Sequence, residues 1–332
     1  MPDPSSRLSI HVADPGYGPG LDASDMDTAD VRTDIEPVAW APLRPQPRPS
    51  GELVFIDGAQ QIEAWLTVSH ADEPRPLAGV AFAVAAGAVR AGHGDRAEVV
   101  DLHVRRAAIC EGDRCLHLPP AGAFRWDPRA GSGRDPFALA RRVGQMRGEL
   151  ELQLAERWAS PERLIVLDGR LSFVRDAHGP VVGAVKSHHR IYLEGELGMV
   201  VSRLAVGERT PLFAIGEDRL SWYQRLPGAG EGGWAGILRG EAPRALGLEV
   251  ARMLADRSTA ELPRYAGRPH RDPRAPQNMV PIMTLEGRLR HRMGDRKLAL
   301  RAVRQAAAGA WLEDAAPEPA PLPVPAALTA AA

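Results

Sequence analysis

The sequence predicts an α/β protein in which helices flank a mixed sheet. Two observations carry this prediction. Two apolar runs, ELVFIDG at 52–58 and RLIVLDG at 163–169, each end in Asp-Gly, and a stretch of helical periodicity lies between them. A run that is apolar on both faces is typical of a buried central strand. Two such strands, more than a hundred residues apart in the sequence, are therefore each followed by an aspartate.

The folded part of the 332-residue chain is predicted to cover 49–310. Residues 1–48 are rich in Pro, Asp, Ser and Gly without a sustained apolar period, and residues 311–332 form an Ala/Pro-rich tail. Segments of this composition bury too little apolar surface to offset the entropy lost on ordering, so both ends are predicted to be disordered. The remaining length suffices for a substantial core.

The first half of the folded part is predicted to be an antiparallel meander. Alternating apolar residues follow Gly58, and Asp-Gly is a strong hairpin signal, so the first apolar run is predicted to turn there and return. Two further strand-like stretches extend the sheet. The four predicted strands cover 52–57, 61–69, 78–89 and 97–109.

A long helix is predicted to follow the meander. Between 135 and 159 the apolar residues step by three or four positions, and Pro136 occupies a first helical turn, which tolerates proline. Ser160-Pro161 ends this helix. The second aspartate strand comes next, at 163–168, and another strand is predicted at 181–186.

Asp57 and Asp168 end the two apolar strands. An acid at the carboxyl end of a central strand projects into the crevice where sheet-based active sites lie. Two carboxylates on neighbouring strands repel each other unless a cation lies between them, and carboxylate oxygens select Mg²⁺ or Mn²⁺. The pattern therefore predicts a phosphoryl-transfer site with two metal ions. For Asp57, capping of a turn is the alternative.

Further candidates come from the helix and the last strand. Glu149 and Glu151 flank the apolar stripe of the helix on opposite sides, so either can reach over the sheet edge. Lys186 and His188 follow the last strand and are candidates for neutralising the phosphate or transferring a proton. A polar loop is the alternative for these two residues.

Basic and aromatic residues predict a nucleic-acid surface. The segment from Arg264 to Arg304 contains eleven Arg or Lys and only three acids, a charge pattern expected of a surface that binds a phosphate backbone. A solvated helix face is the alternative. At 219–225 aromatic rings lie beside arginines, a combination suited to stacking on bases and contacting phosphates. The alternation of apolar and polar residues in this segment also fits a strand with a buried Trp222. The predicted contacts are Arg219, Trp222, Arg225, Arg274, Asn278, Arg288, Arg290 and Arg292.

The order of strands and acids resembles that of the ribonuclease H-like nucleases. Within them, VFIDGAQQIEAW, LIVLDGRLSF and VVGAVKSHH resemble the motifs of the NurA-type nuclease family, over about 52–290. The resemblance implies a DNA nuclease that uses Mn²⁺ or Mg²⁺ on single strands or ends. It also implies a role in DNA end processing or repair, a HerA-type hexameric ATPase as partner, and a homodimer.

The resemblance also carries residue roles. It assigns metal binding to Asp57 and Asp168 and to Glu149 or Glu151, and it matches Lys186 to the lysine of the following strand. The chain departs from the family where Ala59 and Arg170 stand in place of serine after Asp-Gly. The late metal ligand of the family would have to be Glu286 or His291.

Several classes of protein are excluded or kept as alternatives. The chain has no apolar stretch long enough to span a bilayer and no signal-peptide layout, so a cytoplasmic protein without membrane contact is expected. It has no P-loop motif and no nucleophile-elbow motif. Two alternatives stay open: an actin- or sugar-kinase-like ATPase on the same sheet, and a non-catalytic DNA-binding adaptor.

Overall fold

The computed structural model describes residues 8–13, 30–46, 51–71, 73–92, 96–112, 114–131, 136–171, 179–186, 188, 190–228, 234–268, 270 and 275–314. The strands are β1 Leu8–Ala13, β2 Val31–Arg32, β3 Leu53–His70, β4 Leu77–Ala91, β5 Glu98–Cys110, β6 Arg114–His117, β7 Asp127–Ala130, β8 Leu164–Asp168, β9 Val181–Val185, β10 Phe213–Ile215, β11 Arg219–Arg225, β12 Ile237–Pro243 and β13 Trp311–Asp314. The helices are α1 Pro136–Trp158, α2 Gly195–Arg203, α3 Leu248–Glu261, α4 Val280–Met293 and α5 Arg296–Ala307, with short 3-10 turns at Arg244–Leu246 and Leu262–Tyr265. None of the described helices combines the length and the apolar character that crossing a membrane requires.

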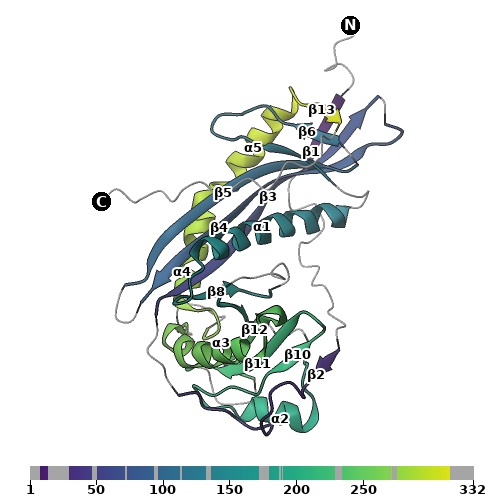
Figure 1. The fold of residues 1–332 in the computed structure, drawn as a ribbon. Coiled ribbons are helices and arrows are strands. Elements are labelled where there is room, and N and C mark those ends of the chain that lie inside the picture. The colour runs from purple at the N-terminus through teal and green to yellow at the C-terminus, as the bar shows by residue number, and fades with distance from the viewer. Residues whose placement is uncertain are drawn as a thin grey trace.

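One mixed sheet of eleven strands organises the chain (Figure 1). Its order is β2-β10-β11-β12-β9-β8-β3-β4-β5-β7, and β1 also pairs with β3. Strands β3, β4 and β5 form the predicted antiparallel meander, while β8 runs parallel to β3 and β9 parallel to β8. The α/β class with a mixed sheet, which the sequence predicted, is confirmed, and β5-β4-β3-β8-β9 form its middle.

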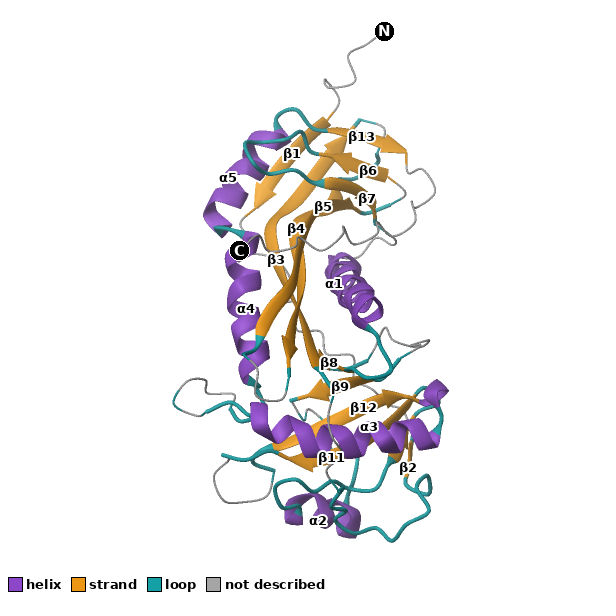
Figure 2. Cartoon of the chain, turned by 60° about the vertical axis from the view of Figure 1, so that its left-hand side comes forward, coloured by secondary structure: helices purple, strands orange, loops and turns teal. Residues whose placement is uncertain are grey.

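Helices cover both faces of the long strands. Figure 2 shows α1 on one side of β3, β4 and β5, and α4 with α5 on the other. Because side chains alternate along a strand, each face of β3 has its own core. Val54 and Ile56 pack with apolar residues of α1, whereas Leu53 and Phe55 pack with those of α4. The predicted helix 135–159 is confirmed by α1, and the predicted strands 163–168 and 181–186 by β8 and β9.

The predicted hairpin at Asp57-Gly58 is wrong. β3 runs without interruption for 18 residues, and its pairing with β4 continues through Asp57 opposite Gly87 and Gly58 opposite Ala86. The register shifts only later, between Ile62 and Ala64. Asp57 therefore lies inside a long strand and does not cap a turn.

Parts of the predicted disordered ends belong to the fold. β1 and β2 lie within residues 1–48 and pair with β3 and β10, and β13 pairs with β6. Glu36 is buried and forms an ion pair of 2.9 Å with the buried Arg209. Backbone hydrogen bonds to open strand edges compensate for the low apolar content of these pieces. Residues 1–7, 14–29, 47–48 and 315–332 lie outside the described residues.

The edge of β3 that faces β8 is divided between two partners. β8 pairs with β3 as far as Ile56, opposite Leu167, and β1 takes over at Trp65, opposite Ala13. No strand among the described residues pairs with 57–64 on this edge. The sheet therefore has a gap beside Asp57, and side chains from its two faces can approach each other there.

Candidate metal centre

Asp57 and Asp168 face the same side of the sheet. Phe55 and Val166, two residues earlier in each strand, belong to the core on the α4 side. Because side chains alternate along a strand, both aspartates face α4. β3 and β8 are adjacent and parallel, with Ile56 opposite Leu167. The strands thus bring the two predicted acids side by side.

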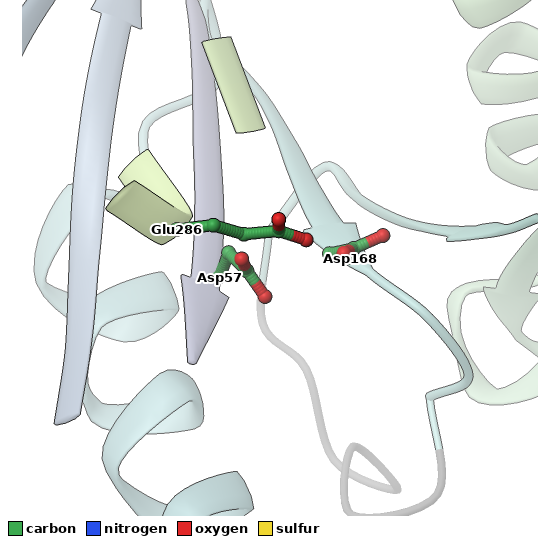
Figure 3. A group of neighbouring side chains, drawn as sticks. All are labelled: Asp57, Asp168 and Glu286. Atoms are coloured by element: carbon green, nitrogen blue, oxygen red, sulfur yellow. The ribbon is translucent and has the colours of Figure 1, made fainter. Parts of the chain in front are cut away.

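Helix α4 adds a third carboxylate. Leu285 and Leu289 are fully buried and fix this helix on the sheet, and Glu286 lies at the edge of their stripe. Asp57, Asp168 and Glu286 each offer a carboxylate oxygen, and these oxygens all lie within 4.8 Å of one another (Figure 3). We call these three residues the acidic cluster. Of the two candidates for the late ligand, the structure brings Glu286 into the cluster, whereas His291 is exposed on α4.

Asp57 is the most deeply buried member of the acidic cluster. It is 6% exposed, and its Oδ1 accepts a hydrogen bond of 2.8 Å from the Gly58 amide. Its Oδ2 is buried without a hydrogen-bond partner among the described residues. Burial, and after it the charges of Asp168 and Glu151, raise the pKa of Asp57 well above its ordinary value. An unpartnered buried oxygen among other carboxylates fits a hard divalent cation.

Glu151 reaches the gap in the sheet from the opposite face. A side-chain carbon built at Gly58 would lie 2.1 Å from Glu151 Oε1 and 2.9 Å from Arg147 Cγ, so the carboxylate occupies the space that glycine leaves. Burial raises the pKa of Glu151 to about 7, against the opposing effect of Arg147. Glu149 instead forms an ion pair of 2.9 Å with Arg142 and is 44% exposed. Of the two helix acids, the structure brings Glu151 to the site.

Arg147 lies at this site and was not among the residues predicted from the sequence. Its Nε lies 3.3 Å from Glu151 Oε1, in an i,i+4 pair on α1. This spacing was the signal that could have found it, because residues four apart are neighbours on a helix surface. Arg147 places a partly exposed cation at the entrance to the gap.

Lys186 lies directly after β9 and points at the acidic cluster. Its Nζ donates to Asp168 Oδ2 at 2.6 Å and to Asn278 Oδ1 at 2.7 Å. Asn278 is fully buried, which is inconsistent with the predicted contact to nucleic acid. The Asn278 side chain holds Lys186 instead.

His188 lies in a different environment. Its Nε2 is 2.9 Å from the carbonyl oxygen of Ile237, and its ring packs near Tyr223 and Trp234, at centroid distances of 5.8 and 5.4 Å. This aromatic packing surrounds the imidazole with β11 and the start of β12.

The predicted nucleic-acid contacts on β11 are corrected by the structure. Trp222 is fully buried, and its Nε1 donates to Gln224 at 3.0 Å, so it cannot stack on a base. Arg225 donates to the backbone carbonyls of Ser202, Leu204 and Ala235. Arg219 pairs with the buried Glu241 at 3.3 Å. Because β11 is covered on both faces, the alternation that suggested a groove is that of a core strand.

The predicted contacts on α4 are accessible. Arg288, Arg290 and Arg292 are all exposed, and the buried side chains of this helix face the sheet. Arg274 lies outside the described residues. The α4 arginines thus keep the accessibility that the predicted contact with phosphates requires.

Raising the pH is expected to destabilise the metal-free protein through Glu151. Its pKa is raised to about 7 from an ordinary 4.5, so between these values the folded state holds a proton that the unfolded chain has released. This contribution to stability is complete below pH 4.5 and is lost as the pH rises through 7, at a cost of about 3 kcal/mol. The free energy of unfolding, measured with urea in EDTA, should fall by this amount more for wild type than for Glu151→Gln between pH 4.5 and 8. Parallel pH curves for the two proteins would contradict the prediction.

No family model and no curated protein matches the chain. Among solved structures, the crystal structure of NurA bound to dAMP and manganese matches over 40% of this chain and 22% of that chain, at 17% identity and a TM-score of 0.19. A crystal structure of NurA matches over the same shares, at 18% identity and a TM-score of 0.18. The matched part thus spans 22% of the length of those NurA chains.

Proposed function

We propose that the protein is a nuclease that hydrolyses phosphodiester bonds in DNA with Mn²⁺ or Mg²⁺. The observation that carries the proposal is the acidic cluster, in which carboxylates from β3, β8 and α4 converge. One buried oxygen of Asp57 in this cluster has no hydrogen-bond partner among the described residues. Oxygen ligands of this kind suit Mn²⁺ and Mg²⁺. The motif resemblance to NurA-type nucleases supports the choice of DNA as substrate.

The acidic cluster would hold the ion, with Glu151 beside it. A bound ion would supply a water of lowered pKa and stabilise charge on the phosphate. The protein's own cations contribute separately. Lys186 is held against Asp168 and would face a phosphate oxygen, and Arg147 would meet the strand at the entrance to the gap.

The DNA would follow the exposed face of α4. Arg290 lies four residues after Glu286, which on a helix is the same flank about 6 Å further along. Arg288 and Arg292 extend the positive charge to either side. Backbone phosphates that neighbour the scissile one would therefore meet guanidinium groups, which bind phosphate well.

Replacing Arg288, Arg290 and Arg292 with Gln is expected to reduce the salt dependence of DNA binding. Each phosphate contact that is lost lowers the number of counterions released when DNA binds. The slope of log affinity against log salt concentration should therefore flatten by about 2 units for single-stranded DNA and about 3 for duplex DNA. Fluorescence anisotropy at several salt concentrations measures this slope. The matched control replaces Arg32, Arg44 and Arg252, which are 53, 61 and 48% exposed on other elements. Equal slopes for the two triple variants would move the DNA path away from α4.

Cleavage assays test the proposed function directly. The purified protein should cleave end-labelled single-stranded or end-bearing DNA in Mn²⁺ or Mg²⁺, and EDTA should stop the reaction. DNA binding without cleavage in either metal would favour the adaptor alternative. That alternative required Asp57 to cap a turn, and Asp57 lies inside a continuous strand. Action in DNA repair with a HerA-type ATPase, and as a homodimer, stays a prediction from the resemblance.

A further inference from the structure

Helix α5 carries a second basic surface, which continues the one on α4. Figures 1 and 2 show α5 following α4 along the same side of the long strands. Leu300 and Val303 pack with apolar residues of β3 and β1, so the opposite face of α5 points to solvent. Three exposed cations step by four and three residues, which places them in one stripe on that face. We call Lys297, Arg301 and Arg304 the α5 stripe.

The charge pattern of the α5 stripe is unfavourable for the helix itself. Like charges four residues apart on a helix repel each other, and Lys297 precedes Arg301 by four. Lys297 also lies in the first turn, next to Arg296, where the helix dipole disfavours cations. The sequence of α5 contains no acid that would offset these charges.

Other helices of the protein pair such cations with acids. Arg147 has Glu151 four residues further along α1, and Arg257 has Glu261 four residues further along α3. Among the described residues, no acid forms an ion pair with a member of the α5 stripe. Cations that repel one another and that no acid neutralises are expected on a surface that binds an anionic ligand.

The length and position of the α5 stripe suit a chain of phosphates. Its three cations extend over about 10 Å along the helix axis, which is the length of about three phosphates on one DNA strand. Two of the three are arginines, whose guanidinium groups bind phosphate oxygens in pairs. Arg304 comes eighteen residues after Glu286, which is at most about 27 Å if both helices run in line. A strand that leaves the acidic cluster along α4 therefore arrives at the α5 stripe.

We propose that the α5 stripe binds the part of the DNA that lies beyond the active site, so that long strands are cut in preference to short ones. This inference rests on the proposed function and deepens it. It assigns a second contact with DNA, separate from the α4 arginines, and makes the length of the DNA a determinant of specificity.

The preference for long DNA tests the inference in the full chain. For wild type, kcat/KM should be higher for a single strand of about 30 nucleotides than for a trinucleotide, which holds only the scissile phosphate and one neighbour. Replacing the α5 stripe with Gln should reduce the ratio of these two values about tenfold or more, through a higher KM for the long strand. The control variant at Arg32, Arg44 and Arg252 should keep the wild-type ratio. Equal ratios for the two triple variants would overturn the inference and leave the proposed function standing.

DNA binding in EDTA separates the inference from the proposed function. The slope of log affinity against log salt concentration should be flatter by about 2 units for the α5 variant than for wild type on the long single strand. Combining the α5 and α4 substitutions should flatten it by about 4 units, because the two helices contact different phosphates. If wild type cut no DNA, the nuclease would be refuted, and a flattened slope would still support the contact between DNA and α5.

A membrane surface is the other polyanion that the α5 stripe has to be tested against. Vesicles that contain anionic phospholipid should bind wild type and the α5 variant equally weakly. Vesicle binding that is lost in the α5 variant while its DNA affinity is unchanged would overturn the inference. Removing like charges should not lower the unfolding temperature, so weaker DNA binding by the α5 variant would not come from unfolding.

Discussion

Asp168→Asn is expected to lower metal-dependent DNA cleavage about a thousandfold or more while the protein stays folded. Asn has nearly the same shape as Asp but lacks the charge that binds a cation. The change also removes the ion pair between Asp168 Oδ2 and Lys186 Nζ, which lie 2.6 Å apart in the wild type. Cleavage rates in Mn²⁺, calorimetric titration with Mn²⁺ and circular dichroism measure the three effects separately.

A matched control is Asp256→Asn on α3. Asp256 also forms an ion pair with a cation, Arg209, at 2.7 Å, but it lies on a different element from the acidic cluster. Its substitution removes the same charge and should leave cleavage close to the wild-type rate. If Asp168→Asn cleaved as fast as this control, the acidic cluster would not be the active site.

Gly58→Ala is expected to reduce cleavage about a hundredfold, although it adds a single methyl group. The new carbon would lie 2.1 Å from Glu151 Oε1, so the carboxylate has to leave the gap. Displacing a group that supports a metal site typically lowers metal affinity or activity 10- to 100-fold or more. Gly58 has no positive φ, so the loss would come from space and not from backbone strain. Calorimetry with Mn²⁺ and cleavage rates measure the effect.

Gly144→Ala is the matched control for this change. Gly144 lies in the middle of α1, and a side-chain carbon there would meet nothing within 4 Å. Alanine in a helix interior is favoured over glycine by about 1 kcal/mol, so this variant should be at least as stable as wild type and equally active. Equal activity of both alanine variants would show that Glu151 is not needed in the gap.

Local sequence patterns were sufficient for several elements. The helical period predicted α1 to within a residue at either end, because one face of the helix is apolar over its whole length. The two apolar runs predicted central strands, and an acid at the end of β8 follows from the place where that run stops. The proximity of Asp57 and Asp168 followed once both strands were placed in the middle of the sheet.

Other features depend on contacts between distant segments. Asp-Gly is a turn signal locally, and only pairing with the long β4 shows that β3 continues through it. The alternation of apolar and polar residues around Trp222 indicates that one side of β11 is apolar. It does not reveal that other parts of the protein cover both sides of this strand. The choice of Glu151 over Glu149 depends on the gap between β8 and β1, which no local pattern contains.

The acidic cluster joins three points of the backbone that are each more than a hundred residues apart along the chain. An ion bound there would act as a cross-link, comparable with a disulfide that closes two long loops at once. Closing such loops costs the unfolded chain conformational entropy, and a ligand that binds only the native state adds to its stability. A chelator would therefore loosen the attachment of α4 to the sheet as well as stop the chemistry.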